Sequence, residues 1–190
     1  MTAAGRAGRL KLLAIALMGL LVCGNAHVAA AVDTPTEYQV KAVFLYNFAQ
    51  FVEWPAAAFA DDRAPLVIGV LGEDPFGPDL DAAVRGETVN HRPLLVRRYR
   101  DISQVEACHI LYISGSEGSH LEKILSALRG RTILTVSDSE NFARRGGMVG
   151  FVTEHNRIRL RISLNAVTAG ELSISSKLLR LADIVPAGGG

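Results

Sequence analysis

The residues best suited to hold an anion lie in Ser114–Ser119, a loop of sequence SGSEGS between an apolar segment and a helical one. Backbone N–H groups at a strand-to-helix junction can bind phosphate. Glu117 places a negative charge in the same loop, and loop flexibility with helix capping explains its composition better. The chain contains neither a GxGxxG dinucleotide pattern nor a GxxxxGK[ST] phosphate loop, so no nucleotide site is predicted.

The spacing of the Ser, His, Asp and Cys residues does not indicate a nucleophilic catalyst or a metal site. Ser, His and Asp are all present, but the GxSxG nucleophile elbow is absent and any chain of this length holds all three types. His91, His109, His120 and His155 form no HxH or HxxxH pair, the spacing that would place two ligands on one metal. We therefore expect no catalytic residues, no metal site and no cofactor.

Aromatic side chains form the first surface of interest. Seven of the twelve aromatic residues lie between Tyr38 and Phe59. Tyr46 and Trp54 belong either to a helix that covers the protein core, with Trp54 closing its end, or to a protein interface, where Trp and Tyr are enriched. We take both as candidate partner-binding residues.

Arginines form the second surface of interest. Arg157, Arg159 and Arg161 alternate with aliphatic residues, the pattern of a strand with one buried face. The exposed arginines serve either as a solvated face that discourages edge-to-edge association or as a binding surface for an anionic partner. A second basic cluster, Arg97, Arg98 and Arg100, has the same two interpretations.

Strands and helices that alternate along the chain must position these residues. A helix is predicted over 34–54, with Thr36 as its N-cap and Pro55 after its end. Its expected core stripe is Val40, Phe44, Phe48 and Phe51. Further helices are predicted at Asp79–Val84, His120–Leu128 and Ala166–Leu181, and a short helix is predicted to start at Ser137–Glu140 and to end at Gly146-Gly147. Strands are predicted at Val67–Leu71, Leu94–Arg98, His109–Ile113, Thr132–Val136, Met148–Thr153 and Arg157–Leu164.

This alternation predicts an α/β fold with a single, mostly parallel sheet and helices on both faces. A C-terminal antiparallel hairpin adds an edge to the sheet and precedes the last helix. No repeat or long linker divides residues 31–190, so we expect one domain. The tail Ala187–Gly190 is expected to be disordered.

The first thirty residues have the pattern of a secretory signal peptide. Arg6, Arg9 and Lys11 precede the apolar run 12–22, and no acidic residue occurs in this segment. Cleavage is expected after Ala30 or Ala31. Eleven apolar residues are too few to span a membrane, which takes about 20. Cys23 raises the alternative of a lipid anchor, but Val22 fits a lipobox poorly.

Composition excludes several classes of protein. The 190 residues are 49% hydrophobic and 21% charged, unlike disordered or fibrous chains. The formal charge of +1 is too small to attract nucleic acid through the overall electrostatic field of the protein. Removal of residues 1–30 takes away three basic residues and no acidic one, which leaves a charge of −2 and a single cysteine, Cys108. We expect Cys108 to be buried and unreactive, and no intramolecular disulfide can form in the mature chain.

Several motifs resemble the YfiR-like family of periplasmic proteins. They extend in family order over essentially all of the mature chain, and they are YQVKAVFLYNF (38–48), FVEWP (51–55), LGEDPFG (71–77), GGM (146–148), SLN (163–165) and LSISSKLL (172–179). The resemblance implies an α/β sandwich, commonly dimeric, and a regulator rather than an enzyme. It implies that the protein represses a membrane-bound diguanylate cyclase by binding the periplasmic sensor domain, which lowers cyclic-di-GMP signalling and biofilm formation.

The resemblance further implies that an outer-membrane-associated lipoprotein relieves the repression by competing for the repressor. Well-known members carry disulfides that make repression redox-sensitive, and that property does not extend to a mature chain with one cysteine. Two other functions stay open: a periplasmic small-ligand receptor that uses the loops Gly72–Gly77 and Ser114–Ser119 at the carboxyl ends of the strands, and a hydrolase with a dispersed site.

Overall fold

The computed structural model describes residues 35–155 and 157–186 of the chain. The predicted signal peptide with its cleavage site at Ala30 or Ala31, and the tail Ala187–Gly190, lie outside the described residues. No helix in the described ranges combines the length and the hydropathy that crossing a bilayer requires.

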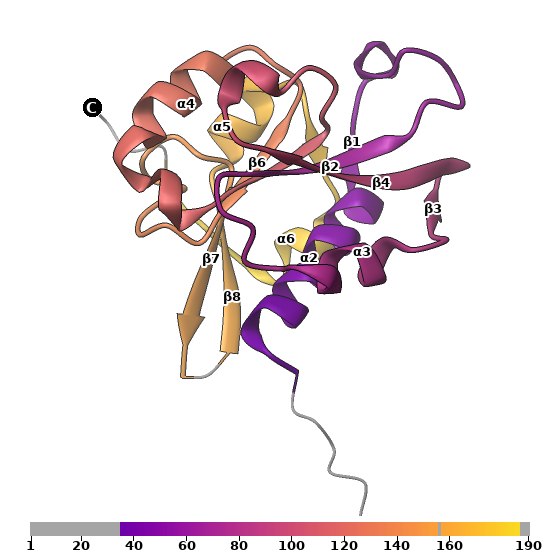
Figure 1. The fold of residues 1–190 in the computed structure, drawn as a ribbon. Helices are drawn as coiled ribbons and strands as arrows, with labels where there is room; N and C mark the ends of the chain where they lie inside the picture. Colours follow the sequence, from indigo (N-terminus) through magenta and orange to yellow (C-terminus); the bar gives the residue numbers. More distant parts are fainter. Residues whose placement is uncertain (1–34, 156, 187–190) are drawn as a thin grey trace, which may run out of the picture. The chain divides into compact units, whose positions relative to one another are not determined.

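One mostly parallel sheet organises the described residues (Figure 1), and its strand order is β10-β8-β7-β6-β5-β2-β4-β3. Its parallel part consists of five neighbouring strands, β4 (Arg92–Tyr99), β2 (Leu66–Leu71), β5 (Ile110–Ile113), β6 (Leu134–Ser137) and β7 (Val149–Glu154). The predicted strands are therefore confirmed, with ends displaced by one or two residues.

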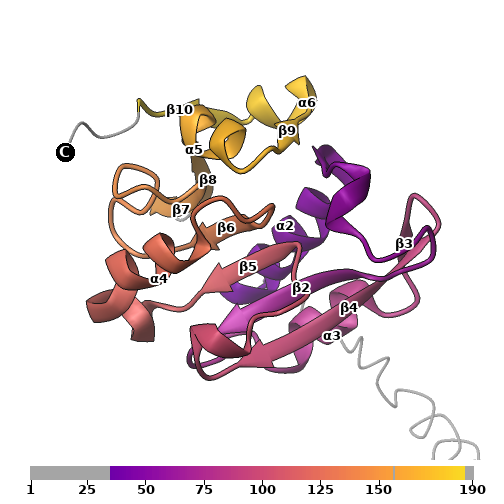
Figure 2. The same cartoon turned by 90° about the horizontal axis from the view of Figure 1, so that it is seen from above.

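Two further regions extend this parallel part at its ends (Figure 2). Next to β7, the antiparallel β8 (Arg157–Ile162) completes the predicted hairpin. Beyond it, β10 (Ala182–Ile184) pairs parallel with β8, so the hairpin does not form the edge as predicted. At the opposite end, the two-residue β3 (Thr88–Val89) pairs antiparallel with the start of β4.

Helices cover both faces of the sheet, as predicted. α2 (Glu37–Phe51) and α3 (Pro78–Val84) pack on one face, and α4 (Leu121–Leu128) packs on the other. β2 is buried along its whole length: Ile68 and Val70 contribute to the core beneath α2, and Leu71 to the core beneath α4. Because both faces of β2 are covered, its sequence is a continuous apolar run.

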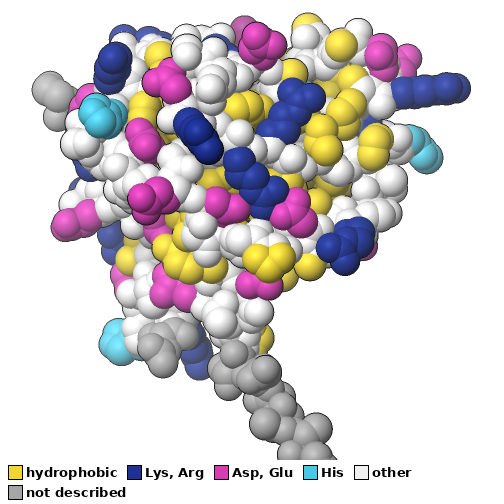
Figure 3. Space-filling model, viewed as in Figure 1, with side chains coloured by type: hydrophobic (Ala, Val, Ile, Leu, Met, Phe, Trp, Pro, Cys, Tyr) yellow, Lys and Arg dark blue, Asp and Glu magenta, His cyan; other side chains and the backbone are white. Residues whose placement is uncertain are grey.

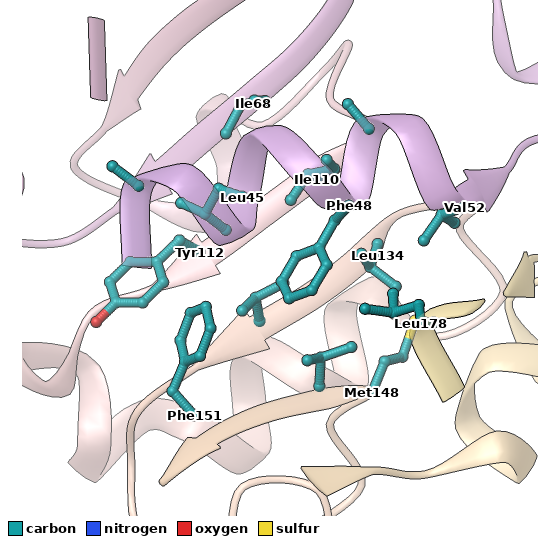
Figure 4. Packing of buried hydrophobic residues seen from close by; sticks show 14 of the residues in the cluster. Leu45, Phe48, Val52, Ile68, Ile110, Tyr112, Leu134, Met148, Phe151 and Leu178 are labelled. Atoms are coloured by element: carbon teal, nitrogen blue, oxygen red, sulfur yellow. The ribbon is translucent and has the colours of Figure 1, made fainter. Parts of the chain in front are cut away.

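The stripe of α2 that faces the core differs from the predicted one by about one residue. Phe48 is fully buried as expected, but its buried neighbours are Lys41 and Leu45, and Phe44 and Phe51 are half-buried. Phe48 stacks on Phe151 of β7 with ring centroids 5.9 Å apart (Figure 4). A lysine therefore occupies a core position of the helix.

The predicted ends of α2 are partly confirmed. Thr36 is the N-cap, and its hydroxyl accepts a hydrogen bond from Gln39 N while the Gln39 side chain accepts one from Thr36 N, which forms a capping box. The helix ends at Phe51, earlier than predicted, because Val52–Glu53 forms β1 and pairs with β9 (Ser173–Ile174). The short 3₁₀ helix η1 (Ala56–Ala58) follows.

Two predicted helices are wrong. Ser137 ends β6, and the residues from there to Gly147 form turns rather than a helix. The helix predicted over Ala166–Leu181 is instead α5 (Leu164–Ala169), β9 and α6 (Ser176–Leu179). α5 ends at Gly170, and Glu171 then has a positive φ of 57°, so the chain turns away and pairs with β1. The remaining short helices are η2 (Ile102–Gln104) and η3 (Gly115–His120).

Candidate partner-binding surface

The two loops considered as a ligand or phosphate site pack against each other. They follow β2 and β5, whose connections leave toward opposite faces of the sheet, the place where such sheets bind ligands. Here Glu73 N donates to Ser116 Oγ at 3.0 Å. A Cβ at Gly72, whose φ is +89°, would lie 2.6 Å from Ser116 Oγ and 2.9 Å from the Glu117 side chain. Side chains therefore fill the point of contact.

A cavity of about 470 Å³ lies instead at the carboxyl end of β6. β6 stops at Ser137, whereas β7 continues to Glu154, and the cavity occupies the space between the loop after β6, the exposed part of β7 and the start of α2. Its lining includes both signs of charge: Lys41, Arg144 and Arg161 with Glu37, Asp138 and Glu140.

Lys41 anchors one wall of this cavity. Its side chain is 2% exposed, and Nζ lies 2.6 Å from Asp138 Oδ2 and 2.6 Å from Glu37 Oε1. Tyr38 donates a further hydrogen bond to Asp138 Oδ2 at 3.0 Å. This network joins the first turns of α2 to the loop after β6, so it positions that loop.

The network holds its members in their charged forms. Burial opposes ionisation of Asp138, but hydrogen bonds from Lys41 and Tyr38 outweigh that cost and lower the pKa of Asp138. Burial likewise opposes the charge on Lys41, and hydrogen bonds to Asp138 and Glu37 outweigh it and raise the pKa of Lys41. The Lys41 ammonium lowers the pKa of Glu37.

Tyr112 lies beneath the same network. Its hydroxyl is buried and has no hydrogen-bond partner among the described residues. Burial, followed by the charge of Asp138, raises the pKa of Tyr112. The phenol is therefore neutral and contributes to the core, where its ring packs edge-on against Phe76.

Arg157, Arg159 and Arg161 lie on one side of β8, as predicted, while Leu160 and Ile162 join the core beneath α2. Glu154 of β7 partly balances them. Its carboxylate lies 2.9 Å from Arg161 and 3.6 Å from Arg159. The Arg159 side chain is 57% exposed, which leaves most of its donors to solvent.

The turns after β6 bring two more arginines to this region, and the sequence analysis did not select them. A shallow groove is lined by Asn141, Arg144, Arg145, Arg161, Asp183, Ile184 and Val185. Arg145 pairs with Glu122, and Arg144 forms no ion pair within residues 35–155 and 157–186. We call Arg144, Arg145, Arg157, Arg159 and Arg161 the arginine surface.

Tyr46 and Trp54 lie elsewhere, on α2 and just after it. The Tyr46 hydroxyl donates to Glu87 at 2.9 Å, and the carboxylate raises the pKa of Tyr46. The Trp54 indole N–H donates to the His109 carbonyl at 3.2 Å. Both side chains are half-buried, and their polar atoms form hydrogen bonds with other residues of the chain. Neither side chain belongs to the arginine surface.

The other residues considered for chemistry have structural partners. Cys108 is a buried free thiol, and burial raises its pKa to about 12, so the predicted burial is confirmed. His109 is buried: its Nδ1 accepts from Val67 N at 3.0 Å, and burial lowers its pKa. In the described part of the chain, no group of three His, Cys, Asp or Glu side chains is placed to hold a metal ion.

Charges of both signs are interspersed over the visible face of the molecule, whereas apolar side chains gather toward β1 and β4 (Figure 3). Arg98 from the second predicted basic cluster lies between two acidic residues, 2.9 Å from Asp74 and paired with Asp81. That cluster is therefore partly neutralised within the chain.

Comparisons with known proteins give one family. A family model described as YfiR/HmsC-like matches residues 38–183, most of the chain and all the strands described above except the end of β10. The search of curated proteins gives no match.

Proposed function

This chain belongs to the YfiR/HmsC-like family, and from that membership we propose that it represses an inner-membrane diguanylate cyclase by binding the cyclase's periplasmic sensor domain. The family match over residues 38–183 carries this proposal. The family indicates a periplasmic regulator of diguanylate cyclase signalling. Repression lowers cyclic-di-GMP and with it biofilm formation, and it requires stoichiometric contact, not catalysis.

The proposed place of action is the periplasm, after cleavage near Ala30 or Ala31. This follows from the pattern of residues 1–30, where three basic residues precede an apolar run without any acidic residue. An outer-membrane-associated lipoprotein that competes for the repressor is the proposed means of relief. Redox control through an intramolecular disulfide is not part of the proposal, because Cys108 is buried and is the one cysteine beyond residue 30.

We assign the partner contact first to the arginine surface. Exposed guanidinium groups bind carboxylates in fixed geometry, and Arg is enriched where binding energy concentrates. Arg144 has no ion pair in the described ranges, and Arg159 is more than half exposed, so both have donors available to an acidic partner. Tyr46 and Trp54 remain candidates for a second contact.

The cellular experiment is deletion of the gene with and without the cyclase. Deletion is expected to raise cyclic-di-GMP in the strain that has the cyclase and to leave it unchanged in the strain that lacks it. Unchanged cyclic-di-GMP in both strains would contradict the proposal.

The binding experiment uses the mature protein and the isolated sensor domain. Arg144→Glu combined with Arg159→Glu is expected to weaken binding at least tenfold, mostly through slower association at low salt. Arg63→Glu combined with Arg85→Glu is the matched control, because both arginines are exposed outside the arginine surface and the two substitutions together make the same change of charge. Equal affinities for the double variant and the control would remove the arginine surface from the proposal.

A small-ligand receptor is the second candidate function, and the cavity beside Lys41 favours it. Its volume of about 470 Å³ lies in the range of small-molecule sites. In a thermal-shift screen of amino acids, nucleotides and sugars, a ligand at one hundred times its Kd stabilises by about 2.7 kcal/mol. A screen in which no compound shifts the transition would leave the regulator without a ligand of these classes.

A further inference from the structure

The β7–β8 hairpin extends beyond the end of the parallel sheet, and this leaves part of one strand without a neighbour (Figure 1). β6 pairs with β7 only at Val149 and Gly150 and then ends. β8 pairs with β7 along its whole length, up to Glu154. From Phe151 to Glu154, the side of β7 that faces away from β8 therefore pairs with no strand that the structure describes.

The hydrogen bonds at the start of the hairpin show which backbone groups of β7 face this open side. Ser163 N donates to Met148 O across the hairpin, whereas Ile162 O points away from β7 and accepts from the chain after β10. Hydrogen-bonded and non-hydrogen-bonded pairs alternate along an antiparallel ladder. Counted from Met148, the pairs that Phe151 and Thr153 form with β8 are therefore non-hydrogen-bonded. Both residues direct their N–H and C=O groups to the open side.

This open side of β7 forms one wall of the cavity of about 470 Å³ at the carboxyl end of β6. Phe151 packs on α2, so α2 covers one face of the sheet here, and its residues Glu37 and Lys41 line the cavity. A Cβ at Gly150 would lie 3.7 Å from Ala143 N, so the turns after β6 cover the other face. The cavity therefore occupies the position that a longer β6 would take, between α2 and those turns.

The outward backbone groups of β7 are matched best by another peptide backbone. No hydrogen bond within the described residues uses the N–H or C=O of Thr153. An extended chain beside a strand edge satisfies donors and acceptors together, because its own N–H and C=O groups alternate in the same way. Three residues of extended chain span about 10 Å, which is the length of β7 from Phe151 to Thr153. This wall therefore favours a short peptide as the ligand.

The charges at the closed end of the cavity determine which end of a peptide fits. There Lys41 lies 2.6 Å from both Glu37 and Asp138, so one ammonium group faces two carboxylates and an excess negative charge remains. A second ammonium group compensates that charge. β6 runs parallel to β7 and ends at this point, so a peptide that continues β6 in the same direction has its first residue here. The amino terminus of a parallel peptide therefore meets the carboxylates.

The other charged residues of the lining are compatible with this direction. Arg161 is bound to Glu154, 2.9 Å away. Arg144 is exposed on the turns after β6, where its guanidinium can donate hydrogen bonds to peptide carbonyl groups. Glu140 is exposed on the same turns and adds to the negative charge. The lining therefore offers carboxylates to the amino end of a peptide and arginine donors to its carbonyl groups.

We propose that this cavity binds the free amino end of an extended peptide, which adds to β7 as a parallel strand and continues the line of β6. The first residues of the peptide pair with the outward groups of Phe151 and Thr153, and the ammonium group lies beside Asp138 and Glu37. The proposal deepens the second candidate function and rests on it, because it names the ligand class of the cavity beside Lys41. It is independent of the repression of a cyclase.

The first experiment compares two peptides by calorimetric titration of the mature protein. One is Ala-Val-Ala amide with a free amino terminus, and the other has a propionyl group in place of the first alanine, so that it lacks only the ammonium group. The propionyl peptide is expected to bind at least tenfold more weakly, because a hydrogen bond to a charged group is lost and the carboxylates keep their excess charge. Equal affinities would overturn the proposal, and so would the absence of binding by both peptides at millimolar concentration.

The second experiment removes one backbone donor from the open side of β7. Thr153→Pro deletes the outward N–H and leaves the ladder with β8 intact, since proline is tolerated where the N–H of a strand faces outward. It is expected to weaken binding of the free-amine peptide at least tenfold. Thr153→Val is the matched control, because it keeps the N–H and loses only the hydroxyl that donates to Glu37, and it is expected to bind like wild type. Urea unfolding shows whether the proline variant is folded, and wild-type affinity in the folded variant would overturn the proposal.

Amide chemical shifts of the wild-type protein give the same test without a substitution. The free-amine peptide is expected to shift the amide of Thr153 more than that of Val152, whose backbone groups face β8. A larger shift at Val152 would overturn the proposal. If both peptides fail and a compound from the thermal-shift screen binds, the second candidate function stands and the peptide assignment falls. None of these measurements uses a cyclase, so their outcome is separate from that of the proposed repression.

Discussion

The two ends of the sheet use arginines in different ways. At the β3–β4 end, Arg98 is held by Asp74 and Asp81, and the neighbouring edge exposes Leu95 and free backbone groups. At the β8–β10 end, the edge strand is short, and Arg144 and Arg159 direct their guanidinium groups to solvent. The first end holds an arginine in ion pairs within the chain, and the second leaves arginines available to an acidic partner.

The two ends are held in place by different contacts. The arginine surface depends on turns after β6 that a buried ion network holds in place. The β4 edge depends on a strand packed between β2 and solvent, with close contacts beneath it. A substitution that disturbs the contacts at one end is therefore expected to leave the structure of the other end intact.

The largest effect is expected from Lys41→Met. It leaves Asp138 and Glu37 without their cation, and removing one partner of a buried ion pair costs about 3–5 kcal/mol. Urea unfolding gives the free energy directly, and the exposed Lys177→Met is the control. At temperatures where the variant is folded, sensor-domain binding is expected to weaken. A loss below about 1 kcal/mol would contradict this role of Lys41.

Gly69→Ala tests the other end. A Cβ at Gly69 would lie 2.7 Å from the Tyr99 ring, 2.8 Å from Cys108 Sγ and 2.9 Å from Leu111. Overpacking of this kind costs about 1–3 kcal/mol, and the displaced Tyr99 belongs to β4, so the free energy of unfolding is expected to fall by about that amount.

Gly118→Ala is the control for that substitution, because no atom lies within 4 Å of its added Cβ. Thermal unfolding measures the difference in stability between the two variants. Equal stability of both alanine variants would show that the β4 end tolerates the added methyl group.

Acid is expected to weaken the ion network that supports the β8–β10 end. The pKa of Asp138 is lowered below its ordinary value of 3.8 in the folded protein. The stabilisation is therefore complete above that value and is lost as the pH falls through the lowered pKa, at about 1.4 kcal/mol for each pKa unit of difference. Comparison of wild type with Asp138→Asn between pH 6 and 3 isolates this contribution, since the variant is expected to show a smaller slope. Identical slopes would assign the acid sensitivity to other carboxylates.

The smallest effect is expected from Arg98→Gln. The Arg98 side chain is 36% exposed, and exposed ion pairs contribute about 0.2–1 kcal/mol each. Stability is expected to fall by about 1 kcal/mol or less, and this loss should shrink in high salt. A loss above about 2 kcal/mol would mean that Arg98 supports the β4 end much more strongly than an exposed ion pair does.

Local patterns predicted most of the sheet and one of its surfaces. The apolar runs around Ile68, Ile110 and Leu134 predicted buried strands because parallel strands covered on both faces need no polar positions. The alternation of Arg157, Arg159 and Arg161 predicted one exposed face of a strand, and β8 has it. Thr36 predicted the start of α2 as its N-cap, and the structure adds the reciprocal hydrogen bond to the Gln39 side chain.

The errors fall where distant contacts override local preference. Residues after Ser163 have helical composition, but pairing of β9 with β1 interrupts the helix at Gly170. Lys41 is a core residue because Asp138, 97 residues away, neutralises it, and apolar periodicity assigns no lysine to a core. Its spacing of four residues from Glu37 and its place on the stripe with Leu45 and Phe48 were the available signals.

By itself the sequence determined the class of fold, the burial of Cys108 and the motifs of its family, because local periodicity and short motifs encode them. Only the tertiary structure decided which arginines share a surface, since Arg144 and Arg161 come from separate turns and strands. It also decided which strands form the two edges of the sheet, β10 and β3. Strand order is set by packing between elements far apart in the chain, and no local pattern records it.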